Sequence, residues 1–274
     1  MSLIVISREM GSGGTQIGKA VAARLGYRFV DREVILEAAR RYDVREDKLL
    51  HLEETKPTVW ERFHRDRDRY LVFLQAAVYA FAVEGDTVIA GRAAPLLLKG
   101  IAHALRVRIT APLAVRAARV AEEERLPLSE AEARVRRYDE ESAARLTNLF
   151  HTDCSSPVHY DLVLNSERGT LESLSQVLVQ TVRLDLFQPT PASQRTLQDL
   201  SLATQVRAAL LCVPELNTLA IQVRAEGAAV FLEGAVFGPQ WAALATQTAK
   251  TIPGVDTVTC ATAEDPPLYT LPRV

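Results

Sequence analysis

The chain has 274 residues, of which 48% are hydrophobic and 24% are charged, and its formal net charge is −2 at pH 7. These values are ordinary for a globular protein with a sizeable core, and they give no global attraction to nucleic acid or to an anionic membrane. No apolar run is long enough to cross a bilayer as a helix.

We therefore expect no nucleic-acid partner and no transmembrane segment. Cys154, Cys212 and Cys260 have no metal-binding spacing, which favours a reduced compartment. The first residues read as a strand rather than as a basic and then apolar leader. The sequence thus predicts a cytoplasmic location without a signal peptide.

The first 26 residues contain a strand, a glycine-rich turn and a helix. The apolar run at 3–6 leads into Gly11, Gly13 and Gly14, and a helix-period stretch then ends at Gly26. Glycines let successive backbone N–H groups turn inward, and a helix N-terminus adds partial positive charge. The arrangement predicts a phosphate-binding loop, and the alternative is a tight turn without a ligand.

This loop departs from the pattern G-x-x-x-x-G-K-[ST], in which the lysine contacts the outer phosphates and the hydroxyl binds magnesium. If Gly13 is the last glycine, Gly14 stands in place of the lysine and Arg8 in place of the first glycine, whereas Thr15 keeps the hydroxyl position. We expect Arg8 to supply the replacement charge. Lys19 is a weaker candidate because it lies more than a helical turn further along.

Two charged residues follow predicted strands. Asp31 ends a strand at 27–30, where open α/β sheets bind ligands, but it is equally placed to cap a helix over 32–41. Arg92 follows a strand at 87–90, where it is placed to clamp a phosphate with two hydrogen bonds. The alternative for Arg92 is a surface position after a turn.

Helices and strands alternate through the rest of the first 184 residues. This alternation predicts a mostly parallel sheet flanked by helices. The expected elements are a helix over 58–83, a strand over 106–111, a helix opened by Pro112, a helix started by a capping box at 129–132, a strand over 160–165 and a helix over 171–184.

The helix that follows residue 129 carries arginines among carboxylates. Arg137, Asp139 and Arg145 belong to this segment. An arginine-bearing helix that closes over phosphates excludes water and neutralises charge during phosphoryl transfer. The competing interpretation, a charged helix that faces solvent, is the more common case.

A smaller unit follows. Residues 186–195 include two prolines and small polar residues, and they predict an interdomain linker. Beyond it the pattern gives a small αββαβ unit without a histidine or clustered carboxylates, so we expect no catalytic site there. The expected elements are a helix at 200–211, strands at 221–224 and 229–234, a helix at 241–251 and a strand at 255–261.

Two resemblances can be drawn from these stretches. Residues 1–185 resemble the cytidylate kinase-like family, a branch of the P-loop nucleoside monophosphate kinases, through ISREMGSGGTQIGKAVAARLGYRFVDRE, VIAGRAAPLL, LRVRITAPLAVRAARV, LSEAEARVRRYDEE and HYDLVLNSE. Residues 196–263 resemble a BON domain through DLSLATQVRAALL, LAIQVRAEGAAVFLEGAV and PGVDTVTC, and 264–274 form a C-terminal tail. The resemblance implies a P-loop NTPase-type fold followed by an interaction module with a protein or phospholipid partner.

The kinase resemblance also implies the reaction. It is the magnesium-dependent transfer of the γ-phosphoryl group of ATP to a nucleoside monophosphate of the CMP or dCMP type. Gly11, Ser12, Gly13, Gly14 and Thr15 would wrap the ATP phosphates, with Thr15 nearest magnesium.

The same resemblance assigns the acceptor side and the lid. Asp31 and Arg92 would lie at the acceptor, with Arg92 pairing its phosphate. Arg137, Asp139 and Arg145 would belong to a mobile lid. Members of this branch often carry glycine in place of the loop lysine, so Gly14 is in keeping with the resemblance.

The lid departs from the kinase pattern, because carboxylates rather than arginines come directly after Asp139. Glu140 and Glu141 would repel a transferring phosphoryl group, which predicts slow turnover. A second hypothesis is therefore a nucleotide-binding regulatory protein with little or no catalysis, whose BON-like unit binds a partner. In that unit Arg207, Arg224 and Lys250 are outnumbered by acidic residues, so we expect no strong electrostatic binding to membranes.

Overall fold

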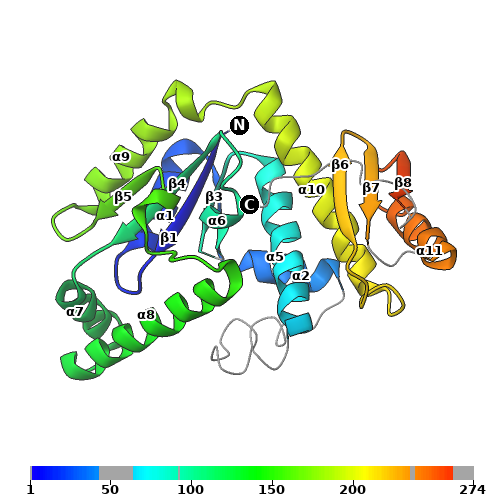
Figure 1. The fold of residues 1–274 in the computed structure, drawn as a ribbon. Coiled ribbons are helices and arrows are strands. Elements are labelled where there is room, and N and C mark those ends of the chain that lie inside the picture. The colour runs from blue at the N-terminus through cyan, green and yellow to red at the C-terminus, as the bar shows by residue number, and fades with distance from the viewer. Residues whose placement is uncertain (1, 43–63, 92, 235–237, 262–274) are drawn as a thin grey trace.

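The computed structural model describes residues 2–42, 64–91, 93–234 and 238–261. The chain forms a large unit around a five-stranded sheet and a smaller unit around a three-stranded sheet (Figure 1). The expected helical residues 58–63 and the candidate Arg92 lie outside the described residues.

The large sheet is parallel throughout, which confirms the predicted architecture. Its strand order is β2-β3-β1-β4-β5. The central strands are buried on both faces, which explains why their sequences are nearly continuous apolar runs. The strands are β1 (Leu3–Arg8), β2 (Arg28–Val30), β3 (Thr87–Ala90), β4 (Ala104–Thr110) and β5 (Leu162–Asn165).

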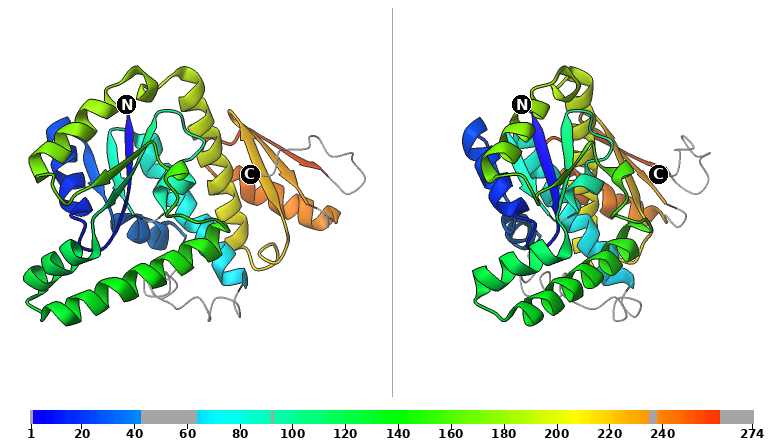
Figure 2. Two further views of the ribbon diagram at one scale, coloured as in Figure 1. Left: turned by 60° about the vertical axis from the view of Figure 1, so that its left-hand side comes forward. Right: turned by 90° about the vertical axis from the view of Figure 1, so that its left-hand side faces the viewer.

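Helices cover both faces of this sheet (Figure 2). They are α1 (Gly14–Leu25), α2 (Glu33–Arg41), α5 (His64–Glu84), α6 (Ala94–Leu97), α7 (Leu113–Glu124), α8 (Leu128–Phe150) and α9 (Leu171–Val182), with short 3-10 turns η1 (Pro157–His159) and η2 (Asp185–Phe187).

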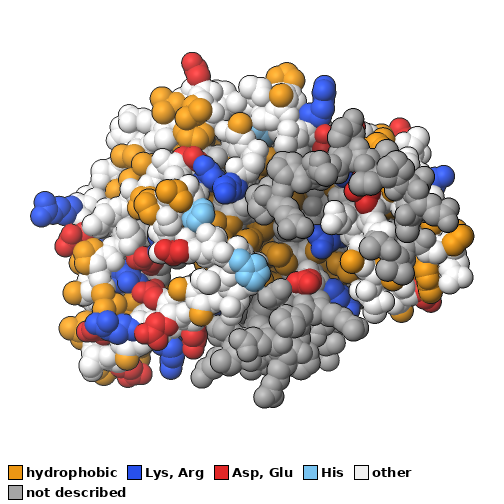
Figure 3. Space-filling model, viewed as in Figure 1, with side chains coloured by type: hydrophobic (Ala, Val, Ile, Leu, Met, Phe, Trp, Pro, Cys, Tyr) orange, Lys and Arg blue, Asp and Glu red, His pale blue; other side chains and the backbone are white. Residues whose placement is uncertain are grey.

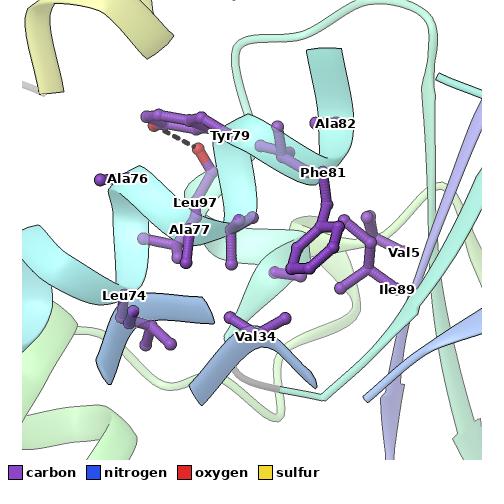
Figure 4. Packing of buried hydrophobic residues seen from close by; sticks show 14 of the residues in the cluster. Val5, Val34, Leu74, Ala76, Ala77, Tyr79, Phe81, Ala82, Ile89 and Leu97 are labelled. Carbon is purple, nitrogen blue, oxygen red and sulfur yellow. Dashed lines mark hydrogen bonds between the residues drawn. The ribbon is translucent and has the colours of Figure 1, made fainter. Parts of the chain in front are cut away.

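Alternate residues of β1 feed two separate cores, because successive strand side chains point to opposite faces. Leu3 and Val5 pack with α2 and α5, whereas Ile4 and Ile6 pack with α1 and α9. Figure 4 shows the first core, in which Phe81 of α5 lies near Val5. At its rim the Tyr79 hydroxyl donates to the carbonyl of Leu97 at 2.9 Å.

The small unit has the predicted αββαβ order. Its strands β6 and β7 pair antiparallel, and β7 and β8 pair parallel. One face of this sheet packs on two helices around a core that includes Val206, Val230 and Ala249. The elements are α10 (Pro191–Cys212), β6 (Gln222–Glu226), β7 (Ala229–Glu233), α11 (Pro239–Lys250) and β8 (Thr257–Ala261).

Helix α10 differs from the expectation at its start. The sequence predicted a linker at 186–195 and a helix from Leu200, but α10 begins at Pro191. Thr190 and Ser193 form a reciprocal capping box, and proline is favoured in the first turn because its missing N–H would be unpaired there anyway. Leu197 packs in the core of the large unit and Leu210 in that of the small one, so this helix is shared by both.

The predicted capping box at 129–132 is wrong. Helix α8 begins earlier, at Leu128, after an N-cap at Pro127 that makes no side-chain capping bond. Among the described residues, no helix combines the length and the apolar character needed to cross a membrane.

Candidate functional site

The glycine-rich loop joins the end of β1 to the start of α1, as predicted. Gly11 and Gly13 have φ values of 74° and 75°, a left-handed conformation that favours glycine. A Cβ atom on Gly11 would lie 2.5 Å from the Arg116 carbonyl oxygen, so only glycine fits. Ser12 is fully buried, and its hydroxyl donates to the carbonyl of Glu9 at 2.7 Å. The loop is therefore a tightly constrained turn.

The first turn of α1 presents backbone N–H groups at the loop. Such groups have no partner within their own helix. In this part of the described chain no side chain caps them, and no acidic residue lies in the first turn. These donors and the positive end of the helix dipole together suit an anion such as a phosphate.

Arg8 binds two of the other predicted site residues. Its Nε donates to the Thr15 hydroxyl at 2.7 Å, and its Nη2 donates to an Asp31 carboxylate oxygen at 2.6 Å. Gly91 lies directly against this guanidinium, where a Cβ would be 2.5 Å from Nη1. Lys19 lies instead over the ring of Phe29, 5.8 Å from its centroid. Of the two candidates to replace the loop lysine, Arg8 is therefore the one that contacts the loop.

The position of Asp31 distinguishes between its two predicted roles, a residue of the ligand site and the cap of the following helix. Arg32 is the N-cap of α2, and no side chain forms a capping hydrogen bond there. The Asp31 carboxylate binds Arg8 instead. Asp31 thus faces the loop at the carboxyl end of the sheet.

A partly buried charge network beneath the loop was not predicted from the sequence. Glu9 accepts from Arg108 at 2.8 Å and from the Thr110 hydroxyl, and its carboxylate lies 3.4 Å from Arg116. Arg116 in turn pairs with Asp139 of α8 at 2.8 Å, and its side chain is only 8% exposed. The network links the loop, β4, α7 and α8.

A second missed arginine lies on the outer side of the loop. Arg119 donates to the Ser166 carbonyl oxygen at 2.7 Å and to the Gly11 carbonyl oxygen at 3.3 Å. It lines a cavity of about 410 Å³ together with Gly13 and Leu174. The available signal was the spacing of Arg116 and Arg119 on a helix that directly follows a strand.

A smaller cavity lies on the other side of the loop, under α8. It has a volume of about 100 Å³ and is lined by Arg8, Arg145, Tyr70 and Tyr138, among others. Burial raises the pKa of Tyr70, against the opposing charge of Arg145. The Tyr70 hydroxyl therefore stays protonated at neutral pH and can donate a hydrogen bond.

The predicted lid residues divide into two groups. Asp139 and Arg145 face inward, to Arg116 and to the smaller cavity. Arg137 is exposed and lines neither cavity. Figure 3 shows charged side chains of both signs gathered over α7 and α8, where Arg134 pairs with Glu124 at 2.8 Å. Helix α8 therefore has a charged side that faces solvent, as one interpretation expected, and inward-facing residues at the site, as the lid interpretation expected.

Among the described residues, no group of three or more histidine, cysteine or acidic side chains is arranged to hold a metal ion. Cys154 is buried, and burial raises the pKa of its thiol to about 11. A thiol with this pKa is a poor nucleophile at neutral pH. The chemistry of the site is that of arginines, hydroxyls and backbone donors.

Comparison with known proteins identifies relatives for both units. A family model described as the cytidylate kinase-like family matches residues 3–168, and one described as the BON domain matches 198–263. A cytidylate kinase from Pyrococcus horikoshii is 28% identical over 176 residues, which cover 64% of this chain and 85% of that protein. A cytidylate kinase from Haloarcula marismortui is 28% identical over 181 residues, covering 66% and 88%.

A solved structure of similar fold supports the architecture. The crystal structure of an uncharacterized protein from Eubacterium ventriosum matches with a TM-score of 0.53 and 17% identity, covering 66% of this chain and 98% of that one. At this identity the match shows the fold alone. The parallel sheet flanked by helices and the second, smaller sheet that follows it confirm the predicted fold class.

Proposed function

Because this chain belongs to the cytidylate kinase-like family and carries a C-terminal BON domain, we propose that it transfers the γ-phosphoryl group of ATP to a nucleoside monophosphate. The proposed acceptor is CMP or dCMP, and the required cation is Mg²⁺. The proposed division places this chemistry in residues 1–185, ahead of helix α10. The BON domain at 196–263 would bind a protein or phospholipid partner.

The observation that carries the proposal is the position of the loop between two cavities. The cavity of about 410 Å³ beside Arg119 has room for a nucleotide, within the usual range of about 300 to 1,000 Å³ for ligand sites. The cavity under α8 is lined by Arg8 and Arg145, two cations suited to an acceptor phosphate. Arg8 lines the cavity under α8 and hydrogen-bonds Thr15 of the loop, so it would contact the phosphoryl group during transfer.

The residues of the loop fit ATP and magnesium. Gly11 to Thr15 supply the backbone cradle, and the first turn of α1 supplies free N–H groups. Thr15 accepts one hydrogen bond from Arg8, which leaves a lone pair on its oxygen for Mg²⁺. Mg²⁺ is commonly held by only one or two protein oxygens together with phosphates and water, and when bound it would neutralise charge on the transferring group.

The side chains would contribute positioning and charge neutralisation. Arg8 stands in for the absent loop lysine, and its ion pair with Asp31 fixes the guanidinium beside the phosphates. Arg145 and Tyr70 line the acceptor cavity, where Arg145 would donate to the acceptor phosphate. Arg92 stays a proposed acceptor-side residue, and Arg137 is proposed to contribute only if α8 turns inward.

The acceptor cavity of about 100 Å³ is smaller than a nucleotide requires, so we expect α8 to move away from it when the acceptor binds. Asp139 anchors α8 through Arg116, below the loop. Binding of ATP at the loop and motion of α8 are therefore proposed to be linked through this pair.

The direct test is production of ADP with Mg²⁺ and a panel of nucleoside monophosphates, with the variants Thr15→Ala and Arg145→Ala. Turnover with CMP or dCMP that both substitutions reduce by at least 100-fold, about 2.7 kcal/mol, supports the proposal. Binding of ATP without turnover on any monophosphate would contradict it. A cytoplasmic location is a separate prediction, tested by fractionation.

A further inference from the structure

A third cavity lies away from the nucleotide site, where the two units meet. It has a volume of about 360 Å³. One wall is α5 of the large unit, and the other is α10 with the segment 216–222 of the small unit. Helices α5 and α10 lie side by side in Figures 1 and 2.

Two arginines from different helices line this cavity. Arg69 comes from α5 and Arg207 from α10. Among the described residues neither forms an ion pair within 4 Å, although Asp68 also lines the cavity and attracts Arg207 at longer range. Most other arginines of known environment in this chain, such as Arg106 and Arg116, have a carboxylate partner.

One nitrogen of Arg69 lacks a hydrogen-bond partner. Its Nε atom is buried and has no hydrogen-bond partner in the described part of the chain. The Cζ atom of Arg69 lies 5.8 Å from the ring centroid of Phe73, which orders this side chain on α5. A buried donor without an acceptor is costly, by about 1 to 3 kcal/mol, so such groups normally have a partner.

The remaining lining indicates the kind of partner. Leucines, among them Leu210 and Leu219, form an apolar surface beside the two arginines, and Asn217 and Thr218 add neutral polar groups. A phosphate monoester presents three oxygens, which two guanidinium forks can share, and the apolar wall would accept a hydrophobic or aromatic portion of the same molecule.

We propose that the cavity between α5 and α10 binds a small soluble organic phosphate, held by Arg69 and Arg207 and distinct from both nucleotide cavities. The ligand would bridge the two units. It would also contact the helix that supplies Tyr70 to the acceptor cavity, one residue away from Arg69. Its binding does not depend on kinase activity.

The test is a calorimetric titration of the full chain with phenyl phosphate, a phosphate monoester with an apolar ring, and with inorganic phosphate and phenol for comparison. We expect saturable binding of phenyl phosphate, weaker binding of inorganic phosphate and none of phenol. Arg69→Gln and Arg207→Gln keep most of the side-chain stem, and each is expected to weaken binding about 10-fold or more. Arg207→Lys keeps the positive charge but not the paired N–H donors of the guanidinium, and it should give an intermediate loss of affinity for phenyl phosphate.

Matched controls identify the site. Arg40→Gln removes an exposed arginine that pairs with Glu37 on α2, and it should leave the affinity unchanged. Thr15→Ala should also leave this binding event unchanged, because it acts at the phosphate loop. Circular dichroism and thermal unfolding of each variant separate lost binding from lost folding.

Three results would overturn the proposal. The first is no saturable binding of phenyl phosphate by the wild-type chain at millimolar concentration. The second is binding that survives both glutamine variants and falls only with Thr15→Ala, which would place the phosphate at the loop. The third is binding to vesicles that contain phosphatidate without any binding of the soluble probe, because the ligand would then be a membrane headgroup.

Discussion

The Arg116–Asp139 pair allows a quantitative test of how α8 is attached to the phosphate loop. Arg116 is 8% exposed, pairs with Asp139 at 2.8 Å and also donates to the carbonyl of Ala111 at 2.9 Å. Removing one partner of a buried ion pair typically costs about 3 to 5 kcal/mol. The Glu9 carboxylate keeps Arg108 as a partner, so we expect Arg116→Met to cost about 3 kcal/mol, the lower end of that range.

The assay is urea unfolding followed by circular dichroism, carried out as a double-mutant cycle. Asp139 is 33% exposed, so Asp139→Asn alone should cost only about 1 kcal/mol. The interaction free energy between the two substitutions should be about 1 kcal/mol, because each substitution removes the same contact. Arg134→Met is the matched control: it breaks the exposed pair with Glu124 between the same two helices, and it should cost less than about 0.5 kcal/mol.

The reasoning fails if Arg116→Met destabilises the protein no more than Arg134→Met does. It also fails if the effects at Arg116 and Asp139 are strictly additive, because the pair would then contribute nothing that depends on both partners.

Three further predictions address the loop and the junction of the two units. Gly11→Ala should weaken ATP binding, measured by equilibrium dialysis, and lower the free energy of unfolding by more than about 2 kcal/mol, because φ is positive and the new methyl group would meet a backbone oxygen. Gly13→Ala also has a positive φ, but its methyl group would enter open space, so it should cost only about 1 kcal/mol in urea unfolding. Arg8→Gln should lower kcat at least 10-fold more than it raises KM for ATP, because the charge acts on the transferring group; equal changes in both would refute this. Burial lowers the pKa of His103, so the unfolded chain binds its proton more readily. The free energy of unfolding is therefore highest above about pH 6.5 and decreases as the pH falls, by up to about 1.4 kcal/mol per pH unit. His103→Gln should reduce this pH dependence in urea titrations between about pH 7.5 and 5.5.

The sequence predicted the parts of the structure that depend on local chemistry. The glycine-rich loop was readable because Gly11 and Gly13 meet a backbone requirement that few other residues can meet. The strands at 3–6 and 87–90 were readable because a strand buried on both faces needs a continuous apolar run. The position of Arg8 beside the loop followed from its place at the end of the first strand.

The parts that were missed depend on contacts between residues far apart in the chain. Arg116 reaches Asp139 and Glu9 only because α7 lies between the loop and α8, and no periodicity shows this. Arg8 at the end of β1 reaches Asp31, which follows β2, across the end of the intervening strand β3, and the order of these strands is not visible in the sequence. The start of α10 differs from the prediction for another reason: the prolines and small polar residues of 186–195 favoured a linker, although Thr190 and Ser193 mark Pro191 as a first-turn proline.

The proposed kinase activity is tested most directly by ATP consumption with Mg²⁺ in the presence and absence of CMP, comparing wild-type protein with Arg145→Ala. We expect ADP formation that requires CMP or dCMP, yields the corresponding diphosphate in equal amount and falls at least 100-fold in the variant. ADP formation that is unaffected by any nucleoside monophosphate, or an Arg145→Ala variant as active as wild type, would contradict the assignment of the cavity under α8 as the acceptor site.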